Sequence, residues 1–309
     1  MVKSVNLYNN FNIKAFHKNS IILIGNFDGL HLGHQKLFAL AKKYKKKYSL
    51  KIGVLTFEPM PKMYFNKKLT NFRISNLKQK INHLRNLNVD FIIKKKFNKV
   101  FSKTKSTNFI SKILAKKLNA KFIFVSNNFR FGNKREGDVK QLIEFENRCN
   151  FKIIKPKPLL SQKKIVSSTL IRKYLQTGKL KEANKLLNRK WSVEGKVQKG
   201  RQLGKKIGFP TANIDIKNYV VACPGVYAVR VKMHKNNKHV KGIANLGYRP
   251  TFSGKKILLE VHLFNFSGNL YNKYLTVEFL KFIRKEKKFK NADQLKKQIK
   301  NDLQIAKNT

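Results

Sequence analysis

The stretch that decides the fold of the first half is Gly25-Asn26-Phe27-Asp28-Gly29-Leu30-His31-Leu32-Gly33-His34, which directly follows the apolar run from Ile21 to Ile24. An apolar run that ends in a glycine-rich segment predicts a buried strand followed by a tight turn. After the turn, apolar residues recur at the spacing of a helix with one buried face, at Leu37, Leu40, Ala41 and Tyr44. The sequence therefore predicts strand, turn and helix in succession, with the helix starting near His34.

His31 and His34 lie three residues apart at the expected start of this helix. The helix dipole and unpaired backbone N–H groups favour an anion there, and two imidazoles at this spacing can face one phosphate. A plain turn with solvated histidines explains a lone His-x-Gly-His equally well, but the order of strand, glycine turn, histidines and helix favours a nucleotide site. We expect further phosphate contacts from Gly25, Phe27, Asp28 and Gly33, since glycine lets a backbone approach closely.

Length and composition are those of a globular protein of two domains. The chain has 309 residues, of which 41% are apolar, and no run is long enough to span a membrane. The N-terminus lacks an apolar signal segment of useful length. For these reasons we expect no membrane partner. Cys149 and Cys223 are too few and too far apart to indicate a disulfide framework or a metal site, which fits a reducing cytoplasm.

The formal charge of +54 suggests a nucleic acid or an anionic membrane as partner. Of the 69 basic residues, however, 58 are Lys and 11 are Arg, and they are spread over the whole length. Base recognition relies on Arg, whereas Lys and the 33 Asn residues share A/T-rich codons. We therefore attribute the charge to codon bias and expect no specific nucleic-acid partner.

The first half alternates apolar strands with amphipathic helices. Strands are expected at 52–57, 89–93 and 122–125, a loop at Glu58-Pro59-Met60-Pro61, and helices capped by Ser75 and Thr107. This alternation predicts a Rossmann-like parallel sheet with ligands at the carboxyl ends of its strands. Two later segments should border the same edge of the sheet. One is Asn128 to Asp138, and the other is Ser167-Ser168-Thr169-Leu170-Ile171-Arg172. In the second segment, hydroxyls at the start of a helix and Arg172 one turn later suit the binding of a phosphate. For Ser168 alone, a plain helix cap would be the better interpretation.

These motifs resemble the nucleotidylyltransferase superfamily, which pairs His-x-Gly-His with a later Ser-Ser-Thr-x-Ile-Arg. Gly25 to Gly29 and the segment after 122–125 narrow the resemblance to the bacterial bifunctional riboflavin kinase and FMN adenylyltransferase family, also called FAD synthetase. The resemblance implies that the N-terminal domain transfers AMP from ATP to FMN. It implies catalytic roles for His31, His34 and Arg172, ATP contacts from Ser168 and Thr169, and flavin contacts from Asn128, Phe129, Arg130 and Asp138.

The pattern changes at Asn188-Arg189-Lys190-Trp191, and we expect the domain boundary there, giving domains 1–187 and 188–309. Short alternating strands without intervening helices follow, which predicts an antiparallel barrel or sandwich. Asn291 can cap a closing helix. A helix break is expected at Gly178, before this boundary.

In the second half, Gly200 to Asn213 is glycine-rich and basic, but it lacks the Gly-Lys-Ser/Thr of a Walker loop. Thr211 and Asn213 offer hard oxygens that suit magnesium held with ATP phosphates, and Glu260 could take a proton from an alcohol. Taken alone, a structural loop and a surface carboxylate paired with lysine explain these residues as well.

Here too the residues resemble the family's riboflavin kinase module, through Gly208-Phe209-Pro210-Thr211-Ala212-Asn213, Gly225-Val226-Tyr227, Asn245 to Phe252 and Glu260-Val261-His262-Leu263. The resemblance implies a small antiparallel barrel, Mg²⁺ and ATP at Thr211 and Asn213, ATP contacts at Gly200 and Gly208, and Glu260 as the base that activates riboflavin. Riboflavin, FMN and ATP are then the partners. A class I aminoacyl-tRNA synthetase also carries His-x-Gly-His, but Ser167 to Arg172 and the kinase half argue against it.

Overall fold

The computed structural model describes residues 4–200, 208–233, 239–251 and 254–309, and the chain divides into two compact units. The first unit comprises Met1–Leu69 and Leu77–Val166, and the second comprises Thr70–Asn76 and Ser167–Thr309. The residues between Ser167 and the expected boundary at 187 therefore group with the C-terminal unit. So does the short segment Thr70–Asn76, although residues of the first unit flank it on both sides.

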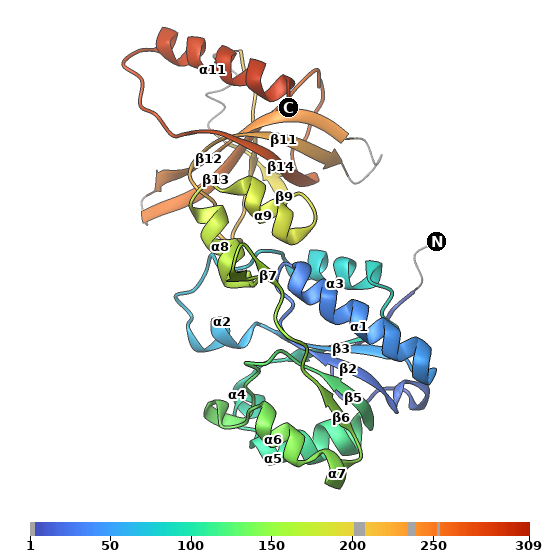
Figure 1. Cartoon of the computed structure of the whole chain (residues 1–309). Helices are drawn as coiled ribbons and strands as arrows, with labels where there is room; N and C mark the ends of the chain where they lie inside the picture. Colours follow the sequence, from blue (N-terminus) through green and yellow to red (C-terminus); the bar gives the residue numbers. More distant parts are fainter. Residues whose placement is uncertain (1–3, 201–207, 234–238, 252–253) are drawn as a thin grey trace. The chain divides into compact units, whose positions relative to one another are not determined.

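The first unit is built on one parallel sheet of six strands in the order β1–β4–β3–β2–β5–β6 (Figure 1). The strands are β1 (Asn6–Tyr8), β2 (Ser20–Ile24), β3 (Ile52–Glu58), β4 (Phe91–Lys96), β5 (Ala120–Phe124) and β6 (Lys152–Ile154). The predicted parallel sheet is confirmed. The strand order reverses between β2 and β5, and doubly wound sheets bind ligands outside the carboxyl ends of the strands at such a point.

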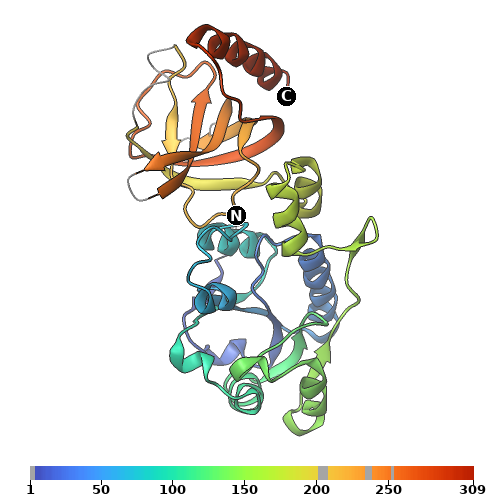
Figure 2. The same cartoon turned by 90° about the vertical axis from the view of Figure 1, so that its left-hand side faces the viewer.

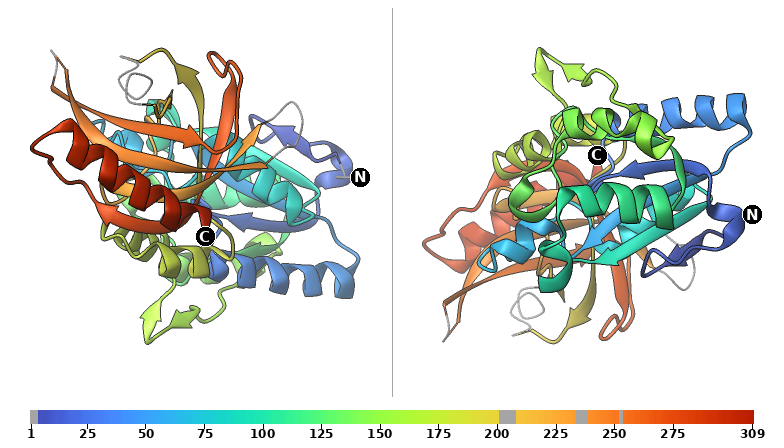
Figure 3. Two further views of the ribbon diagram at one scale, coloured as in Figure 1. Left: turned by 90° about the horizontal axis from the view of Figure 1, so that it is seen from above. Right: turned by 90° about the horizontal axis from the view of Figure 1, so that it is seen from below.

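Helices cover both faces of this sheet, because successive side chains of each buried strand point to opposite sides. Ile21 and Leu23 of β2 share one core with helices α1 (Leu32–Tyr48) and α3 (Leu77–Asn86). Ile22 and Ile24 share the other with the π-helical segment η2 (Phe109–Lys117) and with α6 (Val139–Glu144). Figure 3 (right) shows the green helices of this second layer in front of the strands.

The remaining elements of the first unit are short. They are η1 (Ala15–His17), α2 (Pro61–Phe65), α4 (Lys99–Ser102), α5 (Ser106–Asn108), η3 (Asn133–Arg135), α7 (Glu146–Cys149), β7 (Leu160–Ser161) and β8 (Lys164–Ile165). Strands β7 and β8 form a hairpin, which stands away from the sheet in Figure 2. Two expectations are corrected. Pro61 begins a helix, because proline fits the first helical turn, and Thr107 lies inside α5 and does not cap it.

The second unit is a closed barrel of six strands in the order β10–β13–β12–β11–β14–β9, which confirms the predicted antiparallel barrel. The strands are β9 (Ser192–Gln198), β10 (Ala212–Ile214), β11 (Gly225–Met233), β12 (His239–Thr251), β13 (Gly254–Leu263) and β14 (Tyr274–Lys285). In neither unit does a described helix have the length and apolarity needed to cross a membrane.

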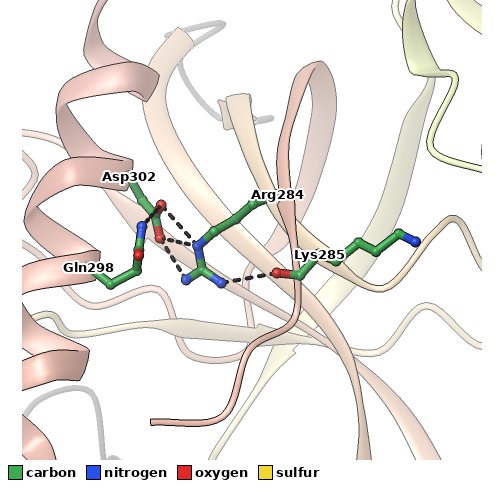
Figure 4. A network of polar contacts seen from close by, with 4 residues as sticks. All are labelled: Arg284, Lys285, Gln298 and Asp302. Carbon is green, nitrogen blue, oxygen red and sulfur yellow. Dashed lines mark hydrogen bonds and ion pairs between the residues drawn. The ribbon is translucent and has the colours of Figure 1, made fainter.

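In the described part of the second unit, three helices accompany the barrel: α8 (Ser168–Gln176), α9 (Leu180–Leu187) and α11 (Ala292–Lys307). Gly178, at φ +75°, separates α8 from α9, as expected. The Asn291 side chain accepts a hydrogen bond from the backbone N–H of Gln294 and so caps α11, as expected. Arg284 of β14 donates two hydrogen bonds from Nε and one from Nη2 to the buried Asp302 carboxylate, at 2.7–3.0 Å, and this ion pair fastens α11 to the barrel (Figure 4).

The segment Thr70–Asn76, which we call the strap, is bonded into the barrel unit at several points. Trp191 Nε1 donates to the Ile74 carbonyl at 2.9 Å, and Arg73 forms a parallel bridge with Tyr219. Asn76 Nδ2 donates to the Glu194 carboxylate at 3.2 Å. The fold of the C-terminal unit therefore includes residues from the middle of the N-terminal half of the sequence.

Candidate active sites

The turn after β2 lies at the carboxyl edge of the sheet, where the strand order reverses. Gly25 continues the pairing with β3 by donating its N–H to the Leu55 carbonyl, and Gly29 then takes a positive φ of +78°. Phe27 is 2% exposed, and its ring contacts the rings of Phe38 and His34. The structure thus places Phe27 in the core, where it shapes the turn and supports His34.

His31 and His34 lie together at the start of α1, which begins at Leu32, two residues before the expected start. The N-cap is His31, whose Nδ1 accepts a hydrogen bond from the His34 N–H at 3.4 Å. The two rings stack with their centroids 3.7 Å apart. A Cβ at Gly33 would lie 3.1 Å from His31 Nδ1 and 3.2 Å from the Val166 carbonyl, so a glycine allows this close approach.

The electrostatics of the turn favour a neutral imidazole at His34. Burial, and then the neighbouring His31, lower the pKa of His34 well below its ordinary value. His34 Nδ1 is enclosed and has no hydrogen-bond partner among the described residues. Because His31 Nδ1 accepts a hydrogen bond, the neutral form of His31 carries its proton on Nε2. Asp28, the other side chain of this turn that was predicted to contact phosphate, is 4% exposed.

Lys80 on α3 is a residue of this site that the sequence analysis missed. Its side chain is 3% exposed, and its Nζ donates to Thr56 Oγ1 at 3.2 Å and to the Asn26 carbonyl of the turn at 3.4 Å. A signal was present, because Lys80 lies three residues after Leu77 and four before Leu84, on the expected inner face of the helix.

The segment that follows β5 contains the predicted flavin-binding residues. Phe129 stacks on Phe131 with centroids 5.5 Å apart, and Asn128 Oδ1 accepts from Ser126 Oγ at 3.0 Å. Arg130 and Asp138 form an ion pair at 3.4 Å near the surface. Asp138 also caps α6, and its hydrogen bond from the Gln141 N–H, and then the Arg130 charge, lower the pKa of this carboxyl.

The predicted Ser168, Thr169 and Arg172 belong to the second unit. Ser167, and not Ser168, caps α8, because its Oγ accepts from the Leu170 N–H at 3.2 Å. Arg172 Nε donates to the Phe72 carbonyl at 2.8 Å, and its guanidinium carbon lies 3.6 Å from the centroid of the Phe72 ring. The structure thus brings Arg172 together with the strap.

A row of polar residues crosses four neighbouring strands of the barrel. Glu260 on β13 pairs in register with Asn213 on β10 and with Asn245 on β12, and Asn213 pairs in turn with Gln198 on β9. Residues directly opposite each other in an antiparallel pair share a face, so these four side chains lie on one side of the barrel wall. The predicted base Glu260 and the predicted metal ligand Asn213 are therefore neighbours.

The loop before β10 is arranged around Asn213. Asn213 is 9% exposed, and its Oδ1 is enclosed without a hydrogen-bond partner in the part of the chain that the structure describes. A Cβ at Gly200 would lie 1.6 Å from Asn213 Nδ2, so no other residue fits there without a shift. Gly208 takes a positive φ of +89°, and residues 201–207 of the expected loop lie outside the described residues.

Thr211 is half-buried and directly precedes β10. The chain before it is held by His262 of β13, whose Nδ1 forms a hydrogen bond with the Pro210 carbonyl at 2.9 Å and whose ring meets that of Phe209 edge-on. Among the described residues no group of three or more His, Cys, Asp or Glu is placed to hold a metal ion. Thr211 and Asn213 carry hard oxygens, which are the kind of ligand that suits magnesium shared with phosphates.

Two family models match this chain, one in each half. The family model described as FAD synthetase matches residues 13–170, and the one described as riboflavin kinase matches residues 187–309. The bifunctional riboflavin kinase/FMN adenylyltransferase of Buchnera aphidicola from Schizaphis graminum is 44% identical over 96% of each chain. The Escherichia coli K12 protein of the same name is 36% identical over 94% of this chain and 92% of its own.

A solved structure also matches the whole fold. It is described as the macrolide-efflux protein of Streptococcus pneumoniae, and it is 30% identical, covers 99% of each chain and superposes with a TM-score of 0.85.

Proposed function

This chain belongs to the family of bifunctional riboflavin kinase/FMN adenylyltransferases, and we propose that the two polar clusters described above are its two active sites. The C-terminal half phosphorylates riboflavin with ATP, which yields FMN. The N-terminal half transfers AMP from a second ATP to FMN, which yields FAD and pyrophosphate. The observation that carries the proposal is the pairing of His31 with His34 in one unit and of Asn213 with Glu260 in the other.

In the first unit, we propose that the turn after β2 holds the triphosphate of ATP. An oxygen of the FMN phosphate attacks the α-phosphorus, and the bond from this phosphorus to pyrophosphate breaks. His31 and His34 stabilise the charge that grows on the α-phosphate oxygens, with His31 donating from Nε2. They do so without a covalent intermediate, and the N-terminus of α1 adds its dipole.

The other predicted residues of this reaction take supporting roles in the proposal. Gly25, Asp28 and Gly33 shape the turn around the phosphates, and Phe27 supports it from the core. By the resemblance to the family, Ser168 and Thr169 would contact phosphate oxygens, as would Arg172, whose guanidinium plane is held by Phe72. Flavin contacts fall to the segment after β5, namely Asn128, Phe129, Arg130 and Asp138.

In the second unit, we propose that Glu260 takes the proton of the ribityl 5′-hydroxyl, so that this oxygen attacks the γ-phosphorus and ADP leaves. Thr211 and Asn213 would hold Mg²⁺ together with ATP phosphates, and the enclosed Asn213 Oδ1, which has no hydrogen-bond partner among the described residues, fits this role. When bound, the ion neutralises phosphate charge. Gly200 leaves room for the Asn213 amide itself, and nothing described lies within 4 Å of the Cβ position of Gly208, so the proposal gives both glycines to the loop that receives the phosphates.

We also propose that the protein works in the cytoplasm. Its two cysteines, Cys149 and Cys223, are both unpaired, which suits a reducing compartment. Riboflavin, FMN and ATP are its substrates.

Incubation of the purified protein with riboflavin, ATP and Mg²⁺, followed by chromatographic separation of the flavins, tests the proposal. FMN should appear first and FAD later. When FMN is supplied in place of riboflavin, one pyrophosphate should be released for each FAD formed. The proposal would be overturned if neither flavin product formed, or if omission of Mg²⁺ left both rates unchanged.

A further inference from the structure

Lys80 differs from the other lysines that the structure describes in being buried. The side chain is 3% exposed, and among the described residues no other Lys or Arg is buried to this degree. It lies on the inner face of α3, which also buries Leu84 against the sheet. A leucine or methionine would serve the core at such a position at lower cost, because removing an ammonium from water is expensive.

The contacts of Lys80 join three separate elements at the proposed adenylyl transfer site. Its Nζ donates to Thr56 Oγ1, near the end of β3, and to the Asn26 carbonyl, in the turn after β2. Thr56 Oγ1 in turn donates to the same carbonyl at 3.5 Å. Thr56 is fully buried, so these groups lie beneath the turn and not on the surface.

The position of the Asn26 carbonyl matters because it lies between Gly25 and Phe27, at the point where the strand becomes the turn. Phe27 in turn contacts the ring of His34. A hydrogen bond to a charged donor is stronger than one between neutral groups, and it holds this carbonyl more firmly. A cation at this depth also acts through a low dielectric, where it favours a nearby polyanion more than a surface lysine would.

We propose that Lys80 is a positioning residue of adenylyl transfer, which holds the Asn26–Phe27 turn in the shape that receives the ATP triphosphate. This inference rests on the proposed function of the first unit. Lys80 acts through the turn, and the proposal includes no contact between Lys80 and the reacting atoms.

The test compares Lys80→Met with Lys80→Arg in the full-length protein, with Lys78→Met, on the exposed side of the same helix, as control. Lys80→Met keeps the buried stem and removes the charge. We expect kcat/KM for ATP in the conversion of FMN to FAD to fall about 10- to 100-fold, as for other small displacements at an active site. KM for FMN, the rate of riboflavin phosphorylation and the thermal midpoint should stay close to those of the parent.

Lys80→Arg keeps the charge and should recover part of the loss, whereas Lys78→Met should match the parent. A purely structural lysine predicts the opposite, because methionine fits a core as well or better and leaves FAD formation within about twofold. That result would overturn the inference. So would a fall in the thermal midpoint of Lys80→Met accompanied by an equal loss of both activities.

Thr56→Val supplies an independent measurement if Lys80→Met folds poorly. It removes one acceptor of Lys80 and should lower the same kcat/KM by a smaller factor, about threefold to tenfold. Combined with Lys80→Arg, its effect should be less than additive, because both act on one carbonyl. Additive effects would exclude a shared action.

A parent protein that forms no FAD at all would instead refute the proposed function of the first unit. Failure of the inference about Lys80 and failure of the proposed function are therefore distinguishable.

Discussion

Asn213 on β10 and Glu260 on β13 are direct partners in the register of the barrel, although 47 positions separate them in the sequence. Because opposite residues of an antiparallel pair share a face, the proposed base and the proposed metal ligand lie side by side. The enclosed Oδ1 of Asn213 has no hydrogen-bond partner among the described residues.

The first prediction concerns Glu260→Gln, which keeps the shape of the side chain and removes its basic oxygen. Phosphorylation of riboflavin should slow about 10²- to 10⁴-fold, the typical worth of a positioned general base. Supplied FMN should still be converted to FAD near the parent rate, because Glu260 belongs to the barrel and the paired histidines to the other unit. Parallel loss of FAD formation in a protein that stays folded by circular dichroism would show that the sites are coupled. An unchanged kinase rate would make Glu260 an ordinary surface carboxylate.

The second prediction concerns His31→Ala, which removes the cap of α1 and one of the stacked imidazoles. FAD formation from FMN should slow roughly tenfold to a thousandfold, as when one preorganised charge-stabilising group is lost. Riboflavin phosphorylation, measured in the same preparation, should persist and serves as the control for folding. An unchanged FAD rate would remove the histidines from the mechanism.

The third prediction is a pH dependence of stability caused by His34. Burial and His31 lower its pKa in the folded state well below 6.5, so between these values the unfolded chain binds more protons than the folded chain. The stability of the first unit is then complete above about pH 6.5 and is lost as the pH falls toward the lowered pKa. His34→Gln should lose less of its thermal midpoint than the parent between about pH 7.5 and about pH 5.5. Equal losses in both proteins would show that His34 does not cause the effect.

The fourth prediction concerns the ion pair between Arg284 and Asp302, in which Asp302 is 2% exposed. Asp302→Ala leaves the Arg284 charge without its carboxylate and should lower the free energy of unfolding by about 3–5 kcal/mol in chemical denaturation. Glu278→Ala breaks the more exposed pair with Arg230 and should cost about 0–1 kcal/mol. Similar losses in the two variants would mean that the pair does not fasten α11 to the barrel.

The fifth prediction concerns the charge of +54, which we attribute to codon bias. Binding to labelled random duplex DNA, followed by fluorescence anisotropy, should be weak at low salt and should vanish as salt is added, because only counterion release drives it. Sequence-specific binding that survives physiological salt would contradict this attribution and indicate a nucleic-acid partner.

Much of both folds follows from local sequence. The apolar run at Ile21 to Ile24, the glycines after it and the spacing of Leu37 and Ala41 predict β2, its turn and α1 closely. Alternation of strands and helices predicts the parallel sheet, and the shift to short alternating strands predicts the barrel. These features depend on hydrogen bonds and periodicities between near neighbours in the chain, so they can be derived before any long-range contact is known.

The strap is a feature that only the tertiary structure decided. Nothing in Thr70–Asn76 distinguishes it from the rest of the N-terminal half, yet its Ile74 carbonyl accepts the indole N–H of Trp191, 117 positions away. Likewise the charge of Lys80 is one of 58 lysine charges in the sequence, and its burial under the turn after β2 depends on how α3 packs against the sheet. The sequence by itself determined which chemical groups exist and which local elements carry them. The packing of distant segments decided which groups meet, because burial and strand register depend on the whole of each folded unit and not on neighbouring residues.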